Sequence, residues 1–222
     1  MKLEQVPPPD RVTAELLPAL KVLYAAVESA ILQTVEYFER EHAPVDPSLA
    51  PNLVRYYAKR YLDSVDAPLM DAEIERHELS NNGLLVTFGS HQIRVLKSDN
   101  GRVPVPGNSF TKRDFYQQPL PLIAMTDEGS PLPALKLIAL WDAAPSSYAF
   151  LGLSLALPMS GGEDRASVQC HWQRTITEEM IAAPSAKGAP SDDQVMEPED
   201  DLPISQSPFT KSSSGNANGD SA

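Results

Sequence analysis

The spacing of apolar side chains changes near Asp71, and this change constrains the fold more than any other feature of the chain. Before it, apolar residues recur every three or four positions, which is the period of an amphipathic helix. After it, apolar and polar residues alternate in short runs separated by turn-forming residues, which is typical of strands. Helices grouped ahead of strands favour the α+β class over an alternating α/β chain.

The helical part predicts two helices. One apolar stripe runs over residues 17–38, and Pro18 fits only in a first turn, so the regular helix should begin close to it. The second helix should cover residues 50–65, with Pro51 at its start. Because the linker between them is short, we expect an antiparallel helical hairpin. We interpret the first stripe as the face that packs on the sheet, and a dimer seam is the alternative.

The remaining pattern predicts an antiparallel sheet of about six strands, on which the helical hairpin packs. The Asn-Gly dipeptide at 82–83 and the turn at 89–90 join the first three strands into a meander. Six prolines between residues 102 and 133 exclude a continuous element there, apart from about one helical turn. The expected strands cover residues 74–79, 84–88, 91–97, 136–142, 148–158 and 166–176.

Composition divides the chain into three segments. Residues 1–11 hold three consecutive prolines and are expected to be a disordered lead-in, and residues 12–177 form a single α+β domain. Residues 178–222 are rich in small and polar residues and are expected to be a disordered acidic tail. The chain has a formal charge of −12, of which the tail contributes −7, with nine acidic residues against Lys187 and Lys211.

Charge and composition disfavour some classes of partner. The segment before the tail keeps a charge of −5, which opposes non-specific binding to nucleic acid or to an anionic membrane. The chain has no run of eighteen apolar residues and no apolar stretch of the signal-peptide kind at its start, so the expected compartment is the cytoplasm, with no membrane partner. The single cysteine, Cys170, agrees with a reducing compartment.

The sequence carries no familiar catalytic signature. Glycine-rich phosphate loops, HExxH, GxSxG and CxxC motifs are all absent, so we predict no catalytic residues, no metal site and no cofactor. Cys170 and His171 are adjacent, but on a strand they would face opposite sides. A hydrolase built from the dispersed residues Asp142 and His171 remains the weakest alternative.

One net-basic stretch, residues 94–113, is the candidate binding site. Its cations are capable of holding a phosphate, a carboxylate or a nucleic-acid backbone, with aromatic side chains close by for stacking. The alternative is a solvated sheet face that balances an acidic protein. A second basic-aromatic set, around Arg55 and Tyr57, is interpreted as tyrosines packed under basic stems. The candidate residues are Arg94, Lys97, Arg102, Lys112, Arg113 and Tyr116.

Several segments together resemble an uncharacterised actinobacterial family: NNGLLVTF, HQIRVLK, RDFYQQPL, LIALWD, LGLSLALP and SVQCHW. The likeness covers about residues 50–177, and members of that family are often encoded beside a helix-turn-helix protein with an ImmA/IrrE-type metallopeptidase domain. The chain departs from the family pattern at Met159, where a lysine is usual, and at Ala143 and Ala144, where the family is more acidic. Any site near residues 142–160 is therefore in doubt.

The resemblance implies a protein partner in a regulatory, stress or toxin–antitoxin-like gene pair, and that partner is expected to be the ImmA/IrrE-type regulator. The leading hypothesis is thus a non-enzymatic interaction protein. The alternative is a nucleic-acid-binding or nuclease-like protein that uses residues 94–113.

Overall fold

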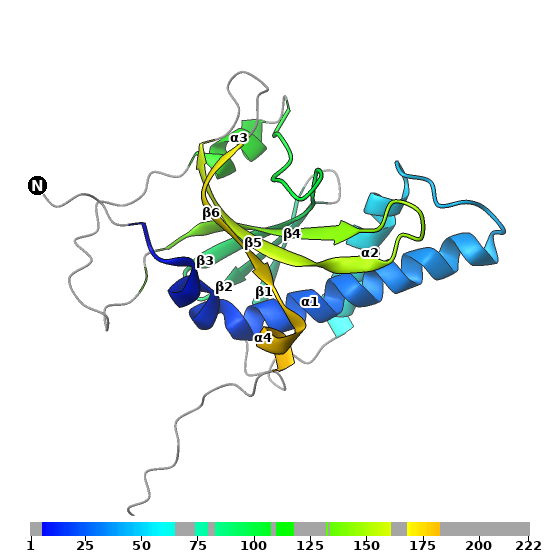
Figure 1. Ribbon diagram of the computed structural model, residues 1–222, viewed down its shortest axis with the longest axis horizontal. Coiled ribbons are helices and arrows are strands. Elements are labelled where there is room, and N and C mark those ends of the chain that lie inside the picture. The colour runs from blue at the N-terminus through cyan, green and yellow to red at the C-terminus, as the bar shows by residue number, and fades with distance from the viewer. Residues whose placement is uncertain are drawn as a thin grey trace, which may run out of the picture. The chain divides into compact units, whose positions relative to one another are not determined.

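The computed structural model describes residues 6–64, 74–79, 83–107, 110–117, 132, 134–160 and 168–182, all of which belong to one unit of the chain, residues 1–185. Most of the predicted tail and the first five residues lie outside these ranges. The α+β class is confirmed, with N-terminal helices packed on a six-stranded sheet (Figure 1). The elements are α1 (Pro9–Arg40), α2 (Ala50–Ser64), β1 (Ile74–Glu78), β2 (Leu84–Phe88), β3 (His91–Lys97), α3 (Phe110–Tyr116), β4 (Lys136–Ala143), β5 (Phe150–Ser160), β6 (Gln169–Ile176) and α4 (Glu178–Ala182).

The strands follow chain order across the sheet, and every neighbouring pair is antiparallel except β3 and β4. These two run parallel, with a register from Gln92 opposite Lys136 to Lys97 opposite Trp141. The expectation of a wholly antiparallel sheet therefore needs this correction. The physical reason is the long connection between them, which carries α3 and returns the chain to the end of the sheet where β3 began.

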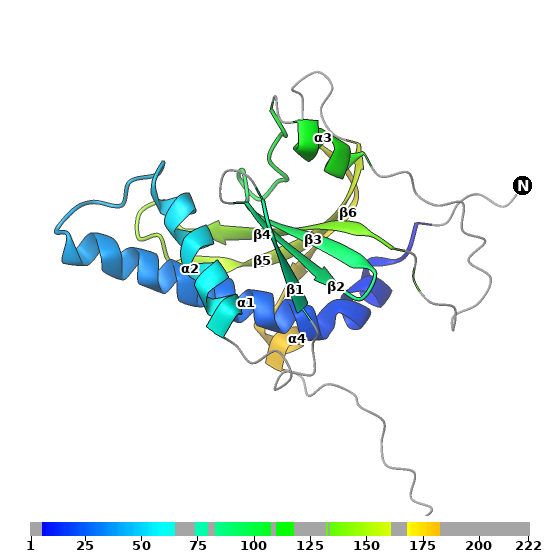
Figure 2. The ribbon, with the colours of Figure 1, turned by 180° about the vertical axis from the view of Figure 1, so that it is seen from behind.

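Apolar side chains cover both faces of the sheet. On one face, α1 and α2 pack side by side over the strands, and the Trp141 side chain is fully buried between them and the sheet. On the other face, α3 and the connection after β3 cover a smaller cluster that includes Phe115 and Tyr116. Figure 2 shows α1 and α2 together, with α3 on the opposite side of the sheet. Strands β3 and β4 are consequently buried on both faces.

Both ends of the folded region lie further out than the expected boundaries at 12 and 177. Helix α1 begins at Pro9, and Pro18 lies inside it, so the prediction that Pro18 belongs to the first turn is wrong. Pro9 suits the start of the helix because a proline at the first helical position loses no intrahelical bond. The Trp172 indole Nε1–H donates to the Pro7 carbonyl at 3.0 Å, which ties the preceding segment to β6. At the other end, α4 packs Met180 and Ile181 against the main core.

No helix in the described part of the chain combines the length and the apolar content that crossing a membrane requires.

A basic pocket at the ends of strands β3 and β4

Three cationic side chains from three separate elements line one small pocket. Arg55 comes from α2, Lys97 from the last position of β3 and Lys112 from α3. The pocket has a volume of about 160 Å³, and its remaining lining residues are Pro51, Leu96, Pro104 and Trp141. It lies where the carboxyl ends of β3 and β4 meet the first turns of α2 and α3, so side chains distant in sequence converge there.

Aromatic packing holds Lys97 in place. The parallel register sets Lys97 opposite Trp141, and its Nζ lies 5.8 Å from the Trp141 ring centroid and 5.1 Å from that of Tyr148. The two rings meet edge to face at 6.3 Å. Tyr148 adopts a positive φ of 56°, which is uncommon for a residue with a side chain and aims its ring inward from the β4–β5 turn. Cation–π contacts therefore stabilise the ammonium group, and no carboxylate of the described residues forms an ion pair with it.

Backbone bonds along α2 orient Arg55. Its Nε–H donates to the Pro51 carbonyl at 3.1 Å, and an Nη group donates to the Asn52 side-chain oxygen. These bonds use two of the five N–H donors of the guanidinium. Burial lowers the pKa of Arg55, because a charged guanidinium loses hydration in this position.

Lys112 lies close to other positive charges. Burial lowers the pKa of Lys112, and the neighbouring charges of Arg94 and Arg55 lower it further. Arg94 and Arg55 are thus close enough to Lys112 to disfavour its charged form. A pocket with this arrangement gains stability from an anion, because opposite charge offsets both the repulsion and the desolvation.

Arg94 lies on the α3 face of β3 and is only 6% exposed. Its guanidinium carbon lies 5.7 Å from the Phe115 ring centroid, and its Nε is buried without a hydrogen-bond partner. None of the ion pairs among the described residues includes Arg94, Arg55 or Lys97. Burial lowers the pKa of Arg94 as well. The interpretation of a solvated sheet face therefore fails at Arg94.

The structure brings together some of the six predicted site residues and separates others. Lys97 and Lys112 line the pocket, and Arg94 adds its charge from the neighbouring face. Tyr116 is fully buried and its hydroxyl donates to the Pro104 carbonyl at 3.0 Å, which fixes one wall of the pocket. Burial raises the pKa of Tyr116 to about 12.

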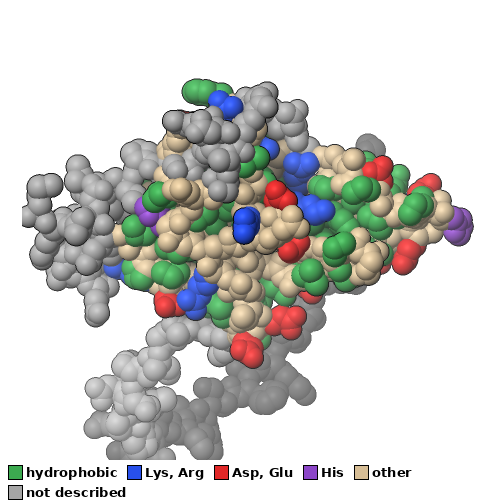
Figure 3. Space-filling model, turned by 45° about the horizontal axis from the view of Figure 1, so that its top comes forward, with side chains coloured by type: hydrophobic (Ala, Val, Ile, Leu, Met, Phe, Trp, Pro, Cys, Tyr) green, Lys and Arg blue, Asp and Glu red, His purple; other side chains and the backbone are tan. Residues whose placement is uncertain are grey.

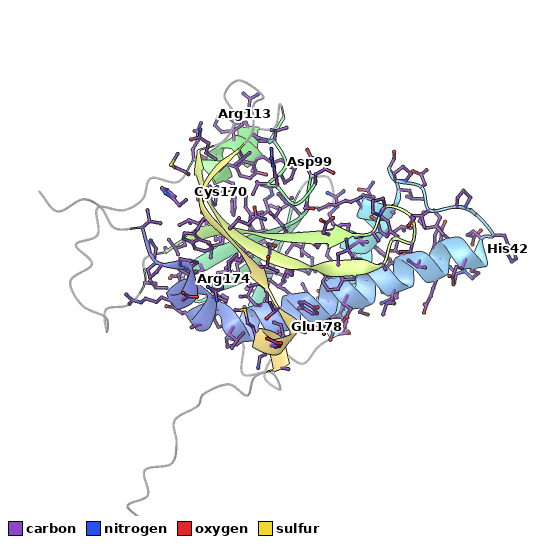
Figure 4. All side chains as sticks on the ribbon, in the orientation of Figure 1. His42, Asp99, Arg113, Cys170, Arg174 and Glu178 are labelled. Atoms are coloured by element: carbon purple, nitrogen blue, oxygen red, sulfur yellow. The ribbon has the colours of Figure 1, made fainter. Side chains whose placement is uncertain are left out.

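Arg102 and Arg113 do not line the pocket. Arg102 is exposed, and its backbone pairs with Asp99 in a tight turn. Arg113 donates from Nε to the Gly107 carbonyl at 2.9 Å, and Figure 4 shows its side chain on α3, on the side of the sheet away from α1.

Sequence reasoning missed Arg55 and Trp141 as members of this site. Arg55 stood out only as one cation in a basic-aromatic helix, and nothing local indicates that the first turn of α2 meets the end of β3. Trp141 was recognised as a core residue, and it is both a core residue and a pocket wall.

A larger groove adjoins the pocket and shares Lys97 with it. The groove has a volume of about 410 Å³ and places Asp99 and Asp142 beside apolar residues such as Tyr148 and Leu151. In Figure 3, positive and negative side chains lie next to one another near the middle of the visible face. The basic pocket thus opens beside a partly acidic, partly apolar surface.

The weaker chemical alternatives gain no support from the geometry. Asp142 lies at the end of β4, level with the carboxyl end of β6, whereas His171 lies several residues back along β6, which is two strands away, so about 20 Å separates the two residues. Burial raises the pKa of Cys170, which disfavours its thiolate. Within the described ranges, no three His, Cys, Asp or Glu side chains are gathered to hold a metal ion.

Comparison with protein families, with curated proteins and with solved structures gave no match for this chain. The function is therefore argued from the pocket itself.

Proposed function

We propose that the protein is a non-enzymatic interaction protein that binds an anionic group of a protein partner in the basic pocket. The observation that carries the proposal is the convergence of Arg55, Lys97 and Lys112 from three elements, with no acidic side chain among the lining residues. Holding like charges together is unfavourable, and charged groups perturbed in this way cluster at functional sites. An incoming anion converts that repulsion into binding energy.

The partner is proposed to belong to a regulatory, stress or toxin–antitoxin-like gene pair, and the product of the adjacent gene, expected to be an ImmA/IrrE-type regulator, is the first candidate. The cytoplasm is the proposed compartment, where the lone Cys170 stays reduced.

Nucleic-acid binding through residues 94–113 is the less favoured function. A nucleic-acid backbone needs a continuous row of accessible cations. Arg94 is buried, and Arg102 and Arg113 lie outside the pocket. The pocket is smaller than the roughly 300–1,000 Å³ typical of sites for whole small molecules, which also favours a terminal anionic group over a nucleotide.

The test is a quantitative binding measurement between the purified full chain and the purified product of the adjacent gene. Lys97→Gln and Lys112→Gln should each weaken the complex by about tenfold or more, since each removes one charge-assisted contact. Arg40→Gln makes the same change of charge at an exposed position of α1 outside the pocket and should leave affinity unchanged.

Absence of a complex, or a complex that tolerates both lysine substitutions, would count against the proposal. Thermal unfolding of each variant, followed by the fluorescence of Trp141 and Trp172 together, separates loss of binding from loss of folding.

A further inference from the structure

We infer that the anion bound in the basic pocket is a phosphate monoester, carried by a phosphorylated side chain of the partner. The inference rests on the proposed function and specifies the chemistry of the group that Arg55, Lys97 and Lys112 recognise.

The charge in and around the pocket exceeds what one carboxylate offsets. Three cations line it, and Arg94 acts on Lys112 from the adjacent face of the sheet. A carboxylate brings one negative charge, whereas a phosphate monoester brings about −1.5 to −2 at neutral pH together with three acceptor oxygens. The three cations come from three separate elements, and a phosphate offers an acceptor oxygen to each of them, whereas a carboxylate has two oxygens.

The size of the pocket points to a terminal group rather than to a whole metabolite. Its volume of about 160 Å³ is large enough for a terminal anionic group and smaller than the roughly 300–1,000 Å³ of sites that enclose whole small molecules. The walls formed by Leu96 and Trp141 are apolar, which strengthens the attraction between a bound anion and the cations. The rest of the ligand would have to lie in the adjoining groove.

That groove argues against an acidic run as the ligand. It shares Lys97 with the pocket and then presents Asp99 and Asp142, so further carboxylates beside the bound anion would meet negative charge. Apolar residues such as Tyr148 and Leu151 offer contact to neutral flanking residues, and the two acids favour a basic one. A single, doubly charged group on a neutral or basic segment would bind the cations of the pocket without bringing further negative charge to the acids of the groove.

The test uses acetylated six-residue peptides of the sequence glycine-alanine-X-alanine-lysine-glycine, in which X is phosphoserine, glutamate or serine, titrated into the full chain at constant ionic strength. The phosphoserine peptide should bind about tenfold or more tightly than the glutamate peptide. This ratio should collapse in Lys97→Gln and in Lys112→Gln, and persist in Arg40→Gln. Lowering the pH from about 7.5 to about 5 should reduce the ratio, because phosphate becomes a monoanion near pH 6.

Equal affinity for the phosphoserine and glutamate peptides, with both dependent on Lys97, would overturn the phosphate inference and leave the proposed function standing. If inorganic phosphate binds as tightly as the phosphopeptide, the ligand is a free anion and the partner segment is excluded. Tighter, pocket-dependent binding of a single-stranded oligonucleotide would instead favour nucleic acid. Lack of binding by any of these probes overturns the inference, while the adjacent-gene measurement still judges the proposed function separately.

Discussion

Replacing Arg94 by methionine is expected to stabilise the protein. Arg94 is almost fully buried, its Nε has no hydrogen-bond partner, and no described carboxylate pairs with it. Its one identified compensation is the contact with the Phe115 ring at 5.7 Å. Methionine keeps much of the length of the side chain and suits the apolar surroundings formed by Leu96 and Tyr116.

The magnitude follows from two opposing contributions. A buried donor left unsatisfied costs about 1–3 kcal/mol, and a cation–π contact of this kind returns about 0.5–2 kcal/mol. Removing both should therefore raise the free energy of unfolding by about 1 kcal/mol, equivalent to about 2–4 °C in Tm for a folded region of this size. Arg113→Met is the matched control, because its guanidinium donates to the Gly107 carbonyl and its loss should cost about 1 kcal/mol.

The assay is urea denaturation in low-salt, phosphate-free buffer, followed by the fluorescence of Trp141 and Trp172 together. Urea is chosen because guanidinium salt would screen the charges under study. A loss of more than about 2 kcal/mol in Arg94→Met would refute the reasoning, since it would mean that the guanidinium makes stabilising contacts worth more than its burial costs. The same sign of change in Arg94→Met and Arg113→Met would refute it too.

Three further outcomes are expected. Burial raises the pKa of both Tyr116 and Tyr148 to about 12 from 10.0, so the stability that their protons confer is complete below pH 10 and is lost as the pH rises to about 12. Ultraviolet absorbance should show two tyrosines that ionise at higher pH than the others, and phenylalanine at both positions should reduce the loss of stability. His91→Ala should cost about 2–4 kcal/mol in urea unfolding, because Nε2 lies 2.9 Å from the Glu15 carboxylate and Nδ1 accepts a backbone N–H from the segment before β4, whereas Glu15→Gln should cost less than half as much. Gly152→Ala should cost about 1–3 kcal/mol by thermal unfolding, since its φ of +136° is strained for any side chain, and a cost near zero would mean that β5 can relax there.

The local sequence pattern was enough to predict most of the helices and strands. Residues 84–88 and 91–97 were predicted as strands, and the structure forms β2 and β3 over the same ranges. Residues 136–142 were predicted as a strand from a short, mostly apolar run, and β4 extends one residue further. These predictions succeed because turn residues mark the ends of the strands, and because a strand covered on both faces, such as β4, is an almost continuous apolar run.

Direction and boundaries depended on contacts that the local sequence does not show. The parallel pairing of β3 with β4 follows from the path of the connection that contains α3, and prolines in that connection indicate irregularity without indicating direction. Helix α4 has only five residues, too few for a periodic signal, and it forms where Met180 and Ile181 pack against the core.

The site was predicted only in part, because the sequence of β3 does not show that both of its faces are covered. Alternation along β3 places Arg94 and Lys97 on opposite faces, as expected, yet the sequence treats both as exposed because strand patterns rarely show that both faces are covered. Lys112 joins Lys97 only because the connection after β3 folds back over the sheet. Arg55 joins them through packing of α2 on the sheet, a contact more than forty residues away in sequence.

In an acidic protein with a positive pocket, an anion is repelled during its approach and attracted once it is inside the pocket. Before a ligand enters the pocket, it senses the summed field of the surface, which salt screens over a Debye length of about 8 Å. The segment before the tail carries −5, so this field repels polyanions weakly. Inside the pocket, Arg55, Lys97 and Lys112 dominate because their charges are close and their surroundings partly apolar. A compact anion on a neutral or basic segment is not repelled by the net charge and is attracted by the cations of the pocket. DNA, RNA or an acidic peptide is repelled by the net charge before it reaches those cations. Raising the salt concentration should therefore weaken binding of an oligonucleotide no more steeply than binding of the phosphoserine peptide, because salt also screens the repulsion between the oligonucleotide and the acidic surface. A steeper salt dependence for the oligonucleotide would show that the pocket is part of a longer positive track.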